Sequence, residues 1–296
     1  MAAPEVNRQV EQWLPILQRS RPFFLWVHYV DPHAPYRRHE PWFSEFFPDA
    51  TPEQRRLDRL VSKHWSVVED LRGERDRDYV VALYDSDIRF LDEQLAVLFE
   101  KVGIDDGDLV IVTADHGEEF LEHGLIGHGR KLYEESVRVP FLLKLPQNER
   151  AGTRVELPVS IIDVFPTIAD VLGLAGASRQ FQGRSVLKLD EKAQARPIYA
   201  STTRFESWKS RALVVGDWKF IHNLKGGPSS ELFNLAADPA ERNDLAATEP
   251  ERVARMRVEL DRLAQLGRDA GSHRQPESVQ LSEEERERLR QLGYGD

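Results

Sequence analysis

The sequence predicts an α/β protein with a layered, mostly parallel sheet flanked by helices, followed by a small C-terminal antiparallel α+β subdomain. Three observations predict this fold class. Segments with helical spacing of apolar residues alternate with short apolar runs before residue 196, which is typical of helices covering a sheet. After it, short strand candidates follow one another between Gly, Asn and Pro turns. The 296 residues suffice for one large and one small domain, so we expect domains at 1–195 and 196–296.

The first domain is expected to alternate helices and buried strands. In chain order these are a helix at 5–18, a strand at 23–29, a helix at 78–102, strands at 108–113 and 137–145, and a helix at 160–172. Gly103 suits the C-terminal end of the long helix, because glycine readily adopts the left-handed conformation. Pro166 must either kink the last helix or lie in its first turn.

The second domain is expected to be a small antiparallel sheet with helices packed on it. Its predicted strands are 197–201, 212–215, 218–222 and 231–235, and its predicted helices are 250–266 and 282–292. Gly216 and Asp217 form a hairpin signal between the second and third of these strands.

Composition and charge exclude several classes of protein. Hydrophobic residues make up 41% of the chain and charged residues 30%, an ordinary globular composition, and no apolar run reaches the roughly 20 residues of a membrane helix. The net charge of -10 argues against nucleic acid as a partner, although a few local cations can still bind an anionic substrate. The absence of cysteine excludes disulfides, thiolate metal sites and a Cys nucleophile within this chain.

Two histidine-rich loops follow predicted buried strands. Three histidines fall between residues 28 and 39, and three between residues 116 and 128. Ligands of open α/β sheets bind outside the C-terminal ends of the strands, so we expect both loops to converge on one pocket. Asp115 and His116 come directly after a strand, and both side chains can bind a divalent cation. The alternative is that Asp115 caps a helix and His116 packs or faces solvent.

The other candidates also have two readings each. His33 lies between Pro32 and Pro35, which hold it in place to donate a proton or bind an anion, or it is an ordinary turn histidine. His128 and Lys131 lie in a glycine-bearing loop that can clamp a tetrahedral anion, or that is simply a charged surface loop. Asp85 and Asp87 are paired carboxylates that suggest a metal site, but residues two positions apart on a helix do not face each other, which favours a solvated or hydrogen-bonded structural role.

The chain resembles the sulfatase family of the alkaline-phosphatase-like superfamily. The sharpest match is Thr-Ala-Asp-His-Gly-Glu at 113–118. The matching segments, in order, are 22–36, 84–92, 113–118, 122–124, 127–129, 132–135, 139–140, 163–168, 183–185, 231–241 and 289–294. This ordered set runs along nearly the whole chain, and the resemblance implies an incomplete alkaline-phosphatase-like domain.

The resemblance also implies a chemistry. It assigns Asp115 and His116 to a calcium site, in which Mg²⁺ or Mn²⁺ can replace Ca²⁺, and His33 to the leaving oxygen of a sulfate ester. Lys131, or His128 in its place, is assigned to binding the sulfate. Sulfatases use a formylglycine hydrate as nucleophile, and the metal and cations stabilise charge on the sulfate oxygens. The implied substrate is a sulfated small molecule or glycan.

The sequence departs from the family where the nucleophile is expected. It contains neither Cys-x-Pro-x-Arg nor Ser-x-Pro-x-Arg, and the first metal-binding Asp pair has no counterpart. We therefore expect the C-terminal portion of a sulfatase, inactive alone, which a complementary N-terminal half can complete. The alternatives are a phosphoester or phosphonate hydrolase of the same superfamily, a non-catalytic anion-binding or partner-binding fragment, and a plain structural domain. For the full-length protein the resemblance implies a periplasmic or extracytoplasmic location.

Overall fold

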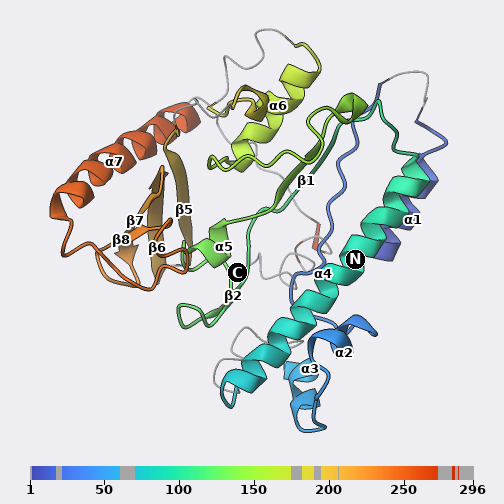
Figure 1. Cartoon of the computed structure of the whole chain (residues 1–296), viewed down its shortest axis with the longest axis horizontal. Coiled ribbons are helices and arrows are strands. Elements are labelled where there is room, and N and C mark those ends of the chain that lie inside the picture. Colours follow the sequence, from blue (N-terminus) through green and yellow to red (C-terminus); the bar gives the residue numbers. More distant parts are fainter. Residues whose placement is uncertain are drawn as a thin grey trace. The chain divides into compact units, whose positions relative to one another are not determined.

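The computed structural model describes residues 2–17, 22–60, 71–174, 182–189, 195–205 and 207–272, together with residues 282, 283 and 286 (Figure 1). The chain divides into two compact units. The first consists of residues 1–105, 119–127 and 280–296, and the second of residues 106–118 and 128–279. The predicted boundary near residue 195 falls inside the second unit, and the domains at 1–195 and 196–296 stay a prediction.

The first unit is built around one long helix. Its elements are α1 (Ala3–Trp13), α2 (Trp42–Phe46), η1 (Gln54–Arg56), α3 (Leu57–Leu60), α4 (Glu74–Val102), β2 (Glu119–Phe120) and β3 (Ile126–Gly127). Gly103 ends α4 in the left-handed conformation with φ +70°, and its N–H donates to the carbonyls of Phe99 and Glu100. The predicted helix end at this glycine is therefore confirmed.

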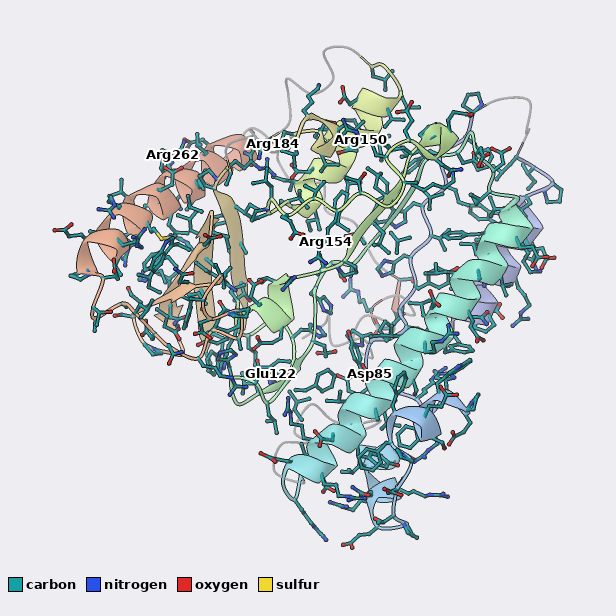
Figure 2. All side chains as sticks on the ribbon, viewed as in Figure 1. Asp85, Glu122, Arg150, Arg154, Arg184 and Arg262 are labelled. Carbon is teal, nitrogen blue, oxygen red and sulfur yellow. The ribbon has the colours of Figure 1, made fainter. Side chains whose placement is uncertain are left out.

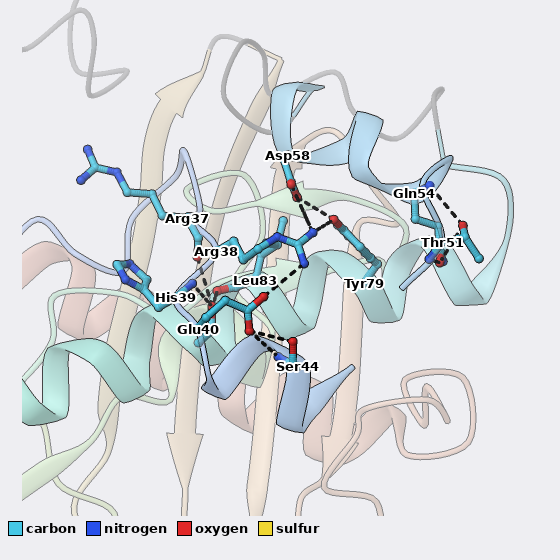
Figure 3. A network of polar contacts seen from close by, with 11 residues as sticks. Arg37, Arg38, His39, Glu40, Ser44, Thr51, Gln54, Asp58, Tyr79 and Leu83 are labelled. Atoms are coloured by element: carbon cyan, nitrogen blue, oxygen red, sulfur yellow. Dashed lines mark hydrogen bonds and ion pairs between the residues drawn. The ribbon is translucent and has the colours of Figure 1, made fainter. Parts of the chain in front are cut away.

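Aromatic side chains form the core of the first unit. Phe43 of α2 and Tyr79 of α4 are fully buried, with ring centroids 5.1 Å apart in an edge-on arrangement. The guanidinium of Arg38 lies 3.8 Å from the Phe43 ring centroid and bonds to Asp58 and to the Tyr79 hydroxyl (Figure 3). Burial, together with the hydrogen bond to Asp58, raises the pKa of Tyr79. These contacts fix the turns before α4 onto the helix.

The β2–β3 hairpin is also attached to α4. Arg77 donates from Nε to the carbonyl of Phe120 at 2.6 Å, and its Nη2 lies 3.4 Å from the carboxylate of Glu122 in the hairpin turn. Glu122 is labelled in Figure 2. The Glu122 carboxylate also accepts the backbone N–H of Phe120. His123, a member of the second histidine-rich loop, lies in the same turn and thus belongs to the first unit.

The predicted buried strand at 23–29 is wrong. Residues 22–30 are extended but form no strand with any residue that the structure describes, and Phe24 and Trp26 are 71% and 70% exposed. Tyr29 is instead tied to α1 through a hydrogen bond to Asn7. An apolar run shows that a segment gains free energy by burial, but it does not identify a partner whose backbone can pair with it.

The second unit contains two sheets. Its elements are β1 (Val110–Thr113), α5 (Glu134–Val137), β4 (Phe141–Lys144), η3 (Pro146–Asn148), η4 (Ile161–Asp163), α6 (Val164–Val171), η6 (Val186–Lys188), β5 (Ile198–Phe205), β6 (Trp208–Val215), β7 (Trp218–Lys225), β8 (Ser230–Asn234) and α7 (Pro250–Ser272). Pro166 lies in the first turn of α6, as one of the two expected arrangements requires.

The expected mostly parallel sheet is not observed. β1 pairs with β4 in antiparallel register, Val112 opposite Leu142, and every other strand pair among the residues described is antiparallel too. The apolar runs at β1 and β4 were correctly placed, but their direction of pairing depends on the path of the connecting chain, which periodicity does not report. The mixed α/β character and the C-terminal antiparallel sheet are confirmed.

The four-stranded sheet has the order β5-β6-β7-β8, and α7 runs along one face of it (Figure 1). Gly216, with φ +56°, forms the predicted turn between β6 and β7. Alternate residues of each strand point to opposite faces, so each face has its own cluster. The cluster under α7 contains Leu213, Phe220, Leu232, Met256 and Leu260, and the opposite cluster contains Ala212, Ile221, Phe233, Leu132 and Tyr133.

The sheet is therefore buried on both faces, and one of them carries the chain segment around residue 132. The predicted helix at 250–266 is confirmed within α7, whereas the helix expected at 282–292 lies almost entirely outside the residues described. Among the residues that are described, no helix is long and apolar enough to cross a membrane.

Candidate active site

The candidate metal-binding pair lies at the end of β1. This strand ends at Thr113, and Asp115 and His116 follow within three residues. The Nδ1–H of His116 donates to the carbonyl of Gly117 at 2.8 Å, which leaves the Nε2 lone pair as the acceptor of the neutral imidazole. Nε2 lies 3.8 Å from Oδ1 of Asp115, whose side chain is 64% exposed. Two electron-pair donors thus lie side by side at an accessible position.

Gly117 holds this turn close to the rest of the second unit. A Cβ atom at this position would lie 2.1 Å from the carbonyl oxygen of Glu135, so only glycine fits. The N–H of Gly117 donates to the carbonyl of Ser136 at 2.9 Å. The Asp-His-Gly sequence is therefore fixed against α5, and the orientation of His116 is fixed with it.

The rings of His116 and His128 are stacked. Their centroids are 3.7 Å apart with 22° between the ring planes. The side chain of His128 is 2% exposed, and its Nδ1 lies 3.0 Å from Oε1 of Glu118, which is 3% exposed. A carboxylate at this distance accepts the Nδ1 proton and orients the imidazole. Asp115, His116 and His128 are thus brought together within one unit.

The segment that follows His128, residues 129–134, lies on the face of the four-stranded sheet opposite α7. Thr202 of β5 donates to the carbonyl of Gly129 at 2.5 Å. Leu132 and Tyr133 pack into the sheet cluster, and the Tyr133 hydroxyl donates to Glu231 of β8 at 2.5 Å. The second domain predicted from the sequence thus supports the loop that bears the candidate anion-binding residues.

A buried ion cluster completes this support. Nζ of Lys219 on β7 lies 2.9 Å from Oε1 of Glu134 and 2.9 Å from Oε1 of Glu241, and no part of the lysine side chain is exposed. Oε2 of Glu241 accepts the backbone N–H of Glu134 at 2.5 Å. Burial raises the pKa of Glu241, while Lys219 acts in the opposite direction. The start of α5 is therefore attached to the sheet by charge-assisted bonds.

Lys131 lies between two aromatic side chains. Its Nζ is 5.6 Å from the Tyr133 ring centroid and 5.7 Å from the Trp208 ring centroid. These rings hold the ammonium group by cation–π attraction at the half-exposed side of the segment. The lysine lies three positions after His128 in the same segment.

His33 belongs to the first unit and lies in a turn. Its N–H donates to the carbonyl of Val30 at 2.8 Å, and its Nδ1 donates to the carbonyl of Ala34 at 2.7 Å. The imidazole is therefore oriented by its own loop, as expected for a histidine near two prolines. The predicted approach of His33 to Asp115 joins residues of different units, and it stays a prediction.

Asp87 anchors the loop that follows His33. Its Oδ2 accepts the N–H of Arg37 at 2.7 Å, and its Oδ1 lies 2.8 Å from Nε2 of His39. Burial raises the pKa of Asp87 to about 7, and burial lowers the pKa of His39, so desolvation favours the neutral form of both partners. The hydrogen-bonded structural role expected for Asp87 is confirmed. Asp85, labelled in Figure 2, is a separate, partly buried group whose pKa burial also raises.

The donors fit part of a cation site. Asp115 and His116 provide one carboxylate and one imidazole, and among the residues that the structure describes there is no group of three His, Cys, Asp or Glu set to hold a metal ion. Ca²⁺ takes six to eight oxygen ligands, so this pair can only be a fraction of such a site.

Several residues that hold the site were given no role from the sequence. Up to 123 positions in the chain separate Glu118, Lys219 and Glu241. Glu118 orients His128, whereas Lys219 and Glu241 hold the residues that follow it. A buried lysine on a strand with alternating apolar residues is the one feature that stands out locally, because isolated lysines are almost never fully buried.

Comparison with known proteins identifies the family. The sulfatase family matches residues 5–174, and the family described as N-sulphoglucosamine sulphohydrolase, C-terminal, matches residues 121–266. The uncharacterized sulfatase YidJ of Escherichia coli (strain K12) is 27% identical over 259 residues, which are 81% of this chain and 50% of that protein. The chain thus spans about half the length of this curated relative.

Two solved structures share the fold. The phosphonate monoester hydrolase of Agrobacterium radiobacter has a TM-score of 0.66 at 22% identity, covering 90% of this chain and 60% of that one. A structure in complex with its substrate, D-glucosamine-2-N,6-O-disulfate, has a TM-score of 0.61 at 18% identity, covering 95% of this chain and 72% of that one. Because the sulfatase family matches more than half of its residues, the chain belongs to the sulfatase family of the alkaline-phosphatase-like superfamily.

Proposed function

We propose that this chain forms part of a sulfatase active site, in which the second unit binds a divalent cation and the sulfate group of a saccharide sulfate. The observation that carries the proposal is the stack of His116 on His128, with Asp115 beside the first ring and Lys131 three residues after the second. Membership of the sulfatase family supports the reaction class. The sulfated sugar bound by a relative of the same fold supports the substrate class.

The cation ligands are assigned to Asp115 and His116. The carboxylate favours a hard cation, Ca²⁺ first and Mg²⁺ or Mn²⁺ as substitutes, and the Nε2 atom of His116 adds a second donor. When bound, the cation stabilises negative charge on the sulfate oxygens. The remaining ligands must come from groups other than this pair.

The anion-binding groups are His128 and Lys131, and the group that protonates the leaving oxygen is His33. Glu118 accepts the Nδ1 proton of His128 and orients its imidazole. Lys131 adds a fixed positive charge. His33 is oriented through its Nδ1 bond, which suits a residue that exchanges a proton at the other ring nitrogen.

The nucleophile is assigned to a segment outside this sequence. The 296 residues contain no cysteine and no Ser-x-Pro-x-Arg, so the formylglycine of the family cannot arise from them. We therefore expect the chain to bind the cation and the anion by itself but to turn over substrate only when a formylglycine-bearing N-terminal segment is supplied.

A second candidate is phosphonate or phosphate ester hydrolysis. The specific observation in its favour is the fold shared with the phosphonate monoester hydrolase. Both reactions use a cation and cationic side chains to stabilise charge on a tetrahedral group. Inorganic sulfate and inorganic phosphate therefore serve as the discriminating ligands, and a sulfatase site is expected to protect the chain better with sulfate.

The cation assignment predicts a calcium-dependent rise in thermal stability. Ca²⁺ binds only the folded chain, so millimolar Ca²⁺ should raise the midpoint of unfolding by roughly 2 °C, and more if the site is tight. Asp115→Asn should abolish the shift. Glu251→Gln, an exposed carboxylate-to-amide change on α7, is the matched control and should retain it. An equal shift in wild type and Asp115→Asn would place the cation elsewhere.

The reaction itself is tested by complementation. The chain is co-expressed with an N-terminal segment of a relative that bears Cys-x-Pro-x-Arg, and arylsulfate hydrolysis is measured. His33→Ala and Asp115→Ala should each lower the rate by at least about a hundredfold, whereas Glu251→Gln should leave it unchanged. Activity that survives both alanine variants would exclude the assigned roles.

A further inference from the structure

A cavity of about 100 Å³ opens beside Lys131 within the second unit. It lies between residues 131–133 and the strands β6 and β7. The glycine turn that joins β7 to β8 completes its wall. The residues that matter for its chemistry are Lys131, Tyr133, Trp208, Asn223, Gly226 and Glu231. Such a volume holds part of a single six-membered ring and is too small for several rings.

The floor of the cavity is rich in hydrogen-bond acceptors. The Glu231 carboxylate accepts from the Tyr133 hydroxyl at 2.5 Å and from Nδ2 of Asn223 at 2.6 Å, and the residue is only 7% exposed. Oδ1 of Asn223 accepts from Ser210 at 2.6 Å, which fixes the orientation of the amide. A carboxylate has about four lone-pair positions and an amide oxygen two, so acceptor capacity remains on both groups.

This floor selects against an anion and in favour of hydroxyl groups. A carboxylate repels a sulfate group placed at the same depth. Hydroxyl groups donate to carboxylate and amide oxygens, and they carry no charge that has to be desolvated. Lys131 remains at the wall, where its charge can contact a sulfate group that lies outside the cavity.

The wall of the cavity presents an aromatic ring that is held in one orientation. A Cβ atom at Gly226 would lie 2.6 Å from Cε3 of Trp208 and 2.5 Å from the carbonyl oxygen of Ser207, so glycine is needed for this close packing. Gly226 also has φ +87°, a conformation that other residues rarely adopt. Trp208 is half-buried, with Nζ of Lys131 5.7 Å from its ring centroid.

We propose that this cavity is the subsite for the sugar ring that carries the sulfate ester. The apolar face of the ring packs against Trp208, and its hydroxyl groups donate to Glu231 and Asn223, while Lys131 contacts the ester group. The inference rests on the proposed function, because it uses Lys131 as the link between the sugar subsite and the anion-binding segment. Trp208 and Glu231 are then the residues that determine which sulfated ring is accepted.

The test measures binding by isothermal titration to the full chain with its cation present. The probes are glucose 6-sulfate, galactose 6-sulfate and glucosamine 6-sulfate, with inorganic sulfate as the probe of the anion site alone. Trp208→Ala should weaken the best sugar sulfate roughly tenfold and leave inorganic sulfate unchanged, since one aromatic contact is removed. Trp208→Phe, which keeps an aromatic ring, should recover part of the affinity. Trp13→Ala, an exposed tryptophan of α1, is the matched control and should change neither ligand.

The outcomes separate the subsite from the proposed function. If Trp208→Ala and Trp208→Phe, both folded by circular dichroism, bind the sugar sulfates as wild type does, the subsite is excluded while the proposed function stands. The same conclusion follows if wild type binds inorganic sulfate but none of the three sugars more tightly. If wild type binds the unsulfated parent sugars in a Trp208-dependent way but shows no binding of inorganic sulfate, the subsite is supported and the proposed function fails.

Discussion

The two histidine-bearing loops of the chain are held in different ways. Residues 31–39 of the first unit are attached to α4 at several points. Asp87 bonds to Arg37 and His39. Ser86 donates to the carbonyl of Arg37, and Arg38 bonds to the Tyr79 hydroxyl. Residues 128–134 of the second unit lie on a sheet face and are attached at several points, from Thr202 at one end to Lys219 at the other. Both loops therefore have several anchors, but those of the first include a buried acid with a raised pKa, and those of the second include a buried lysine between two carboxylates.

This difference shows which change is expected to weaken the attachment of each loop. A single buried acid whose pKa lies near neutrality makes its loop sensitive to pH. The second loop is sensitive instead to the loss of the buried lysine, which leaves buried carboxylates uncompensated. We expect three substitutions to separate these cases.

The largest effect is expected for Lys219→Met. Methionine fills the space of the lysine stem but removes the charge, so the fully buried Glu241 carboxylate loses its partner. The free energy of unfolding should fall by about 3–5 kcal/mol, measured by urea denaturation. Affinity for inorganic sulfate should fall as well, because Glu134 loses its bond to the sheet.

Two controls identify the cause of this loss. Lys225→Met replaces an exposed lysine of the same strand and should change stability by less than about 0.5 kcal/mol. Glu241→Gln added to Lys219→Met removes the unpaired carboxylate charge of Glu241. The double variant should recover at least about half of the lost free energy of unfolding. Equal stabilities for Lys219→Met and wild type would show that the ion cluster does not hold the segment.

The same contrast shows how much the sequence can predict. Helical spacing located α4, α6 and α7, and turn residues located the hairpin at Gly216, because these signals act within a few residues of each other. Asp115, His116 and His128 were singled out by residue type and position, and His116 and His128 are in ring contact. Residue types and short spacings were therefore sufficient to predict these helices, this turn and this histidine pair.

The remaining features depend on contacts between distant residues. Residues 22–30 and β7 both read as apolar strands, yet Trp26 is 70% exposed and Phe220 is fully buried. The more apolar of the two segments is the exposed one, so the outcome depends on whether a pairing strand is present beside the segment. Glu118 and Glu241 lie in segments that resemble the family, but their roles were not predicted, since each functions through a partner that no spacing rule connects to it.

The intermediate effect is expected for Asp87→Asn and depends on pH. The pKa of Asp87 is raised to about 7 in the folded state, so the folded state retains a proton that the unfolded state releases near pH 4. This contribution to stability is fully present below about pH 4 and is lost as the pH rises through about 7. Relative to Asp87→Asn, wild type should therefore lose roughly 2–3 kcal/mol between about pH 5 and about pH 8.

The comparison of the two proteins isolates this carboxyl group. His39, whose pKa burial lowers, contributes in the opposite direction, but it is present in both and largely cancels. Asp92→Asn, on the same helix with a side chain that is 71% exposed, is the matched control and should follow the wild-type profile. A difference between wild type and Asp87→Asn that does not vary with pH would mean that Asp87 titrates alike in the folded and unfolded states.

The smallest effect is expected for Thr202→Val. Valine keeps the β-branched shape that suits strand β5 but removes the hydroxyl group that donates to the carbonyl of Gly129. Because this bond is one of several anchors, the free energy of unfolding should fall by only about 1 kcal/mol, and amide exchange should rise at residues 129–131 alone. Thr153→Val, at an exposed threonine, controls for the change in side-chain polarity and should affect neither measurement. A loss as large as that of Lys219→Met would show that this one hydrogen bond, and not the buried ion cluster, is the main attachment of residues 128–134.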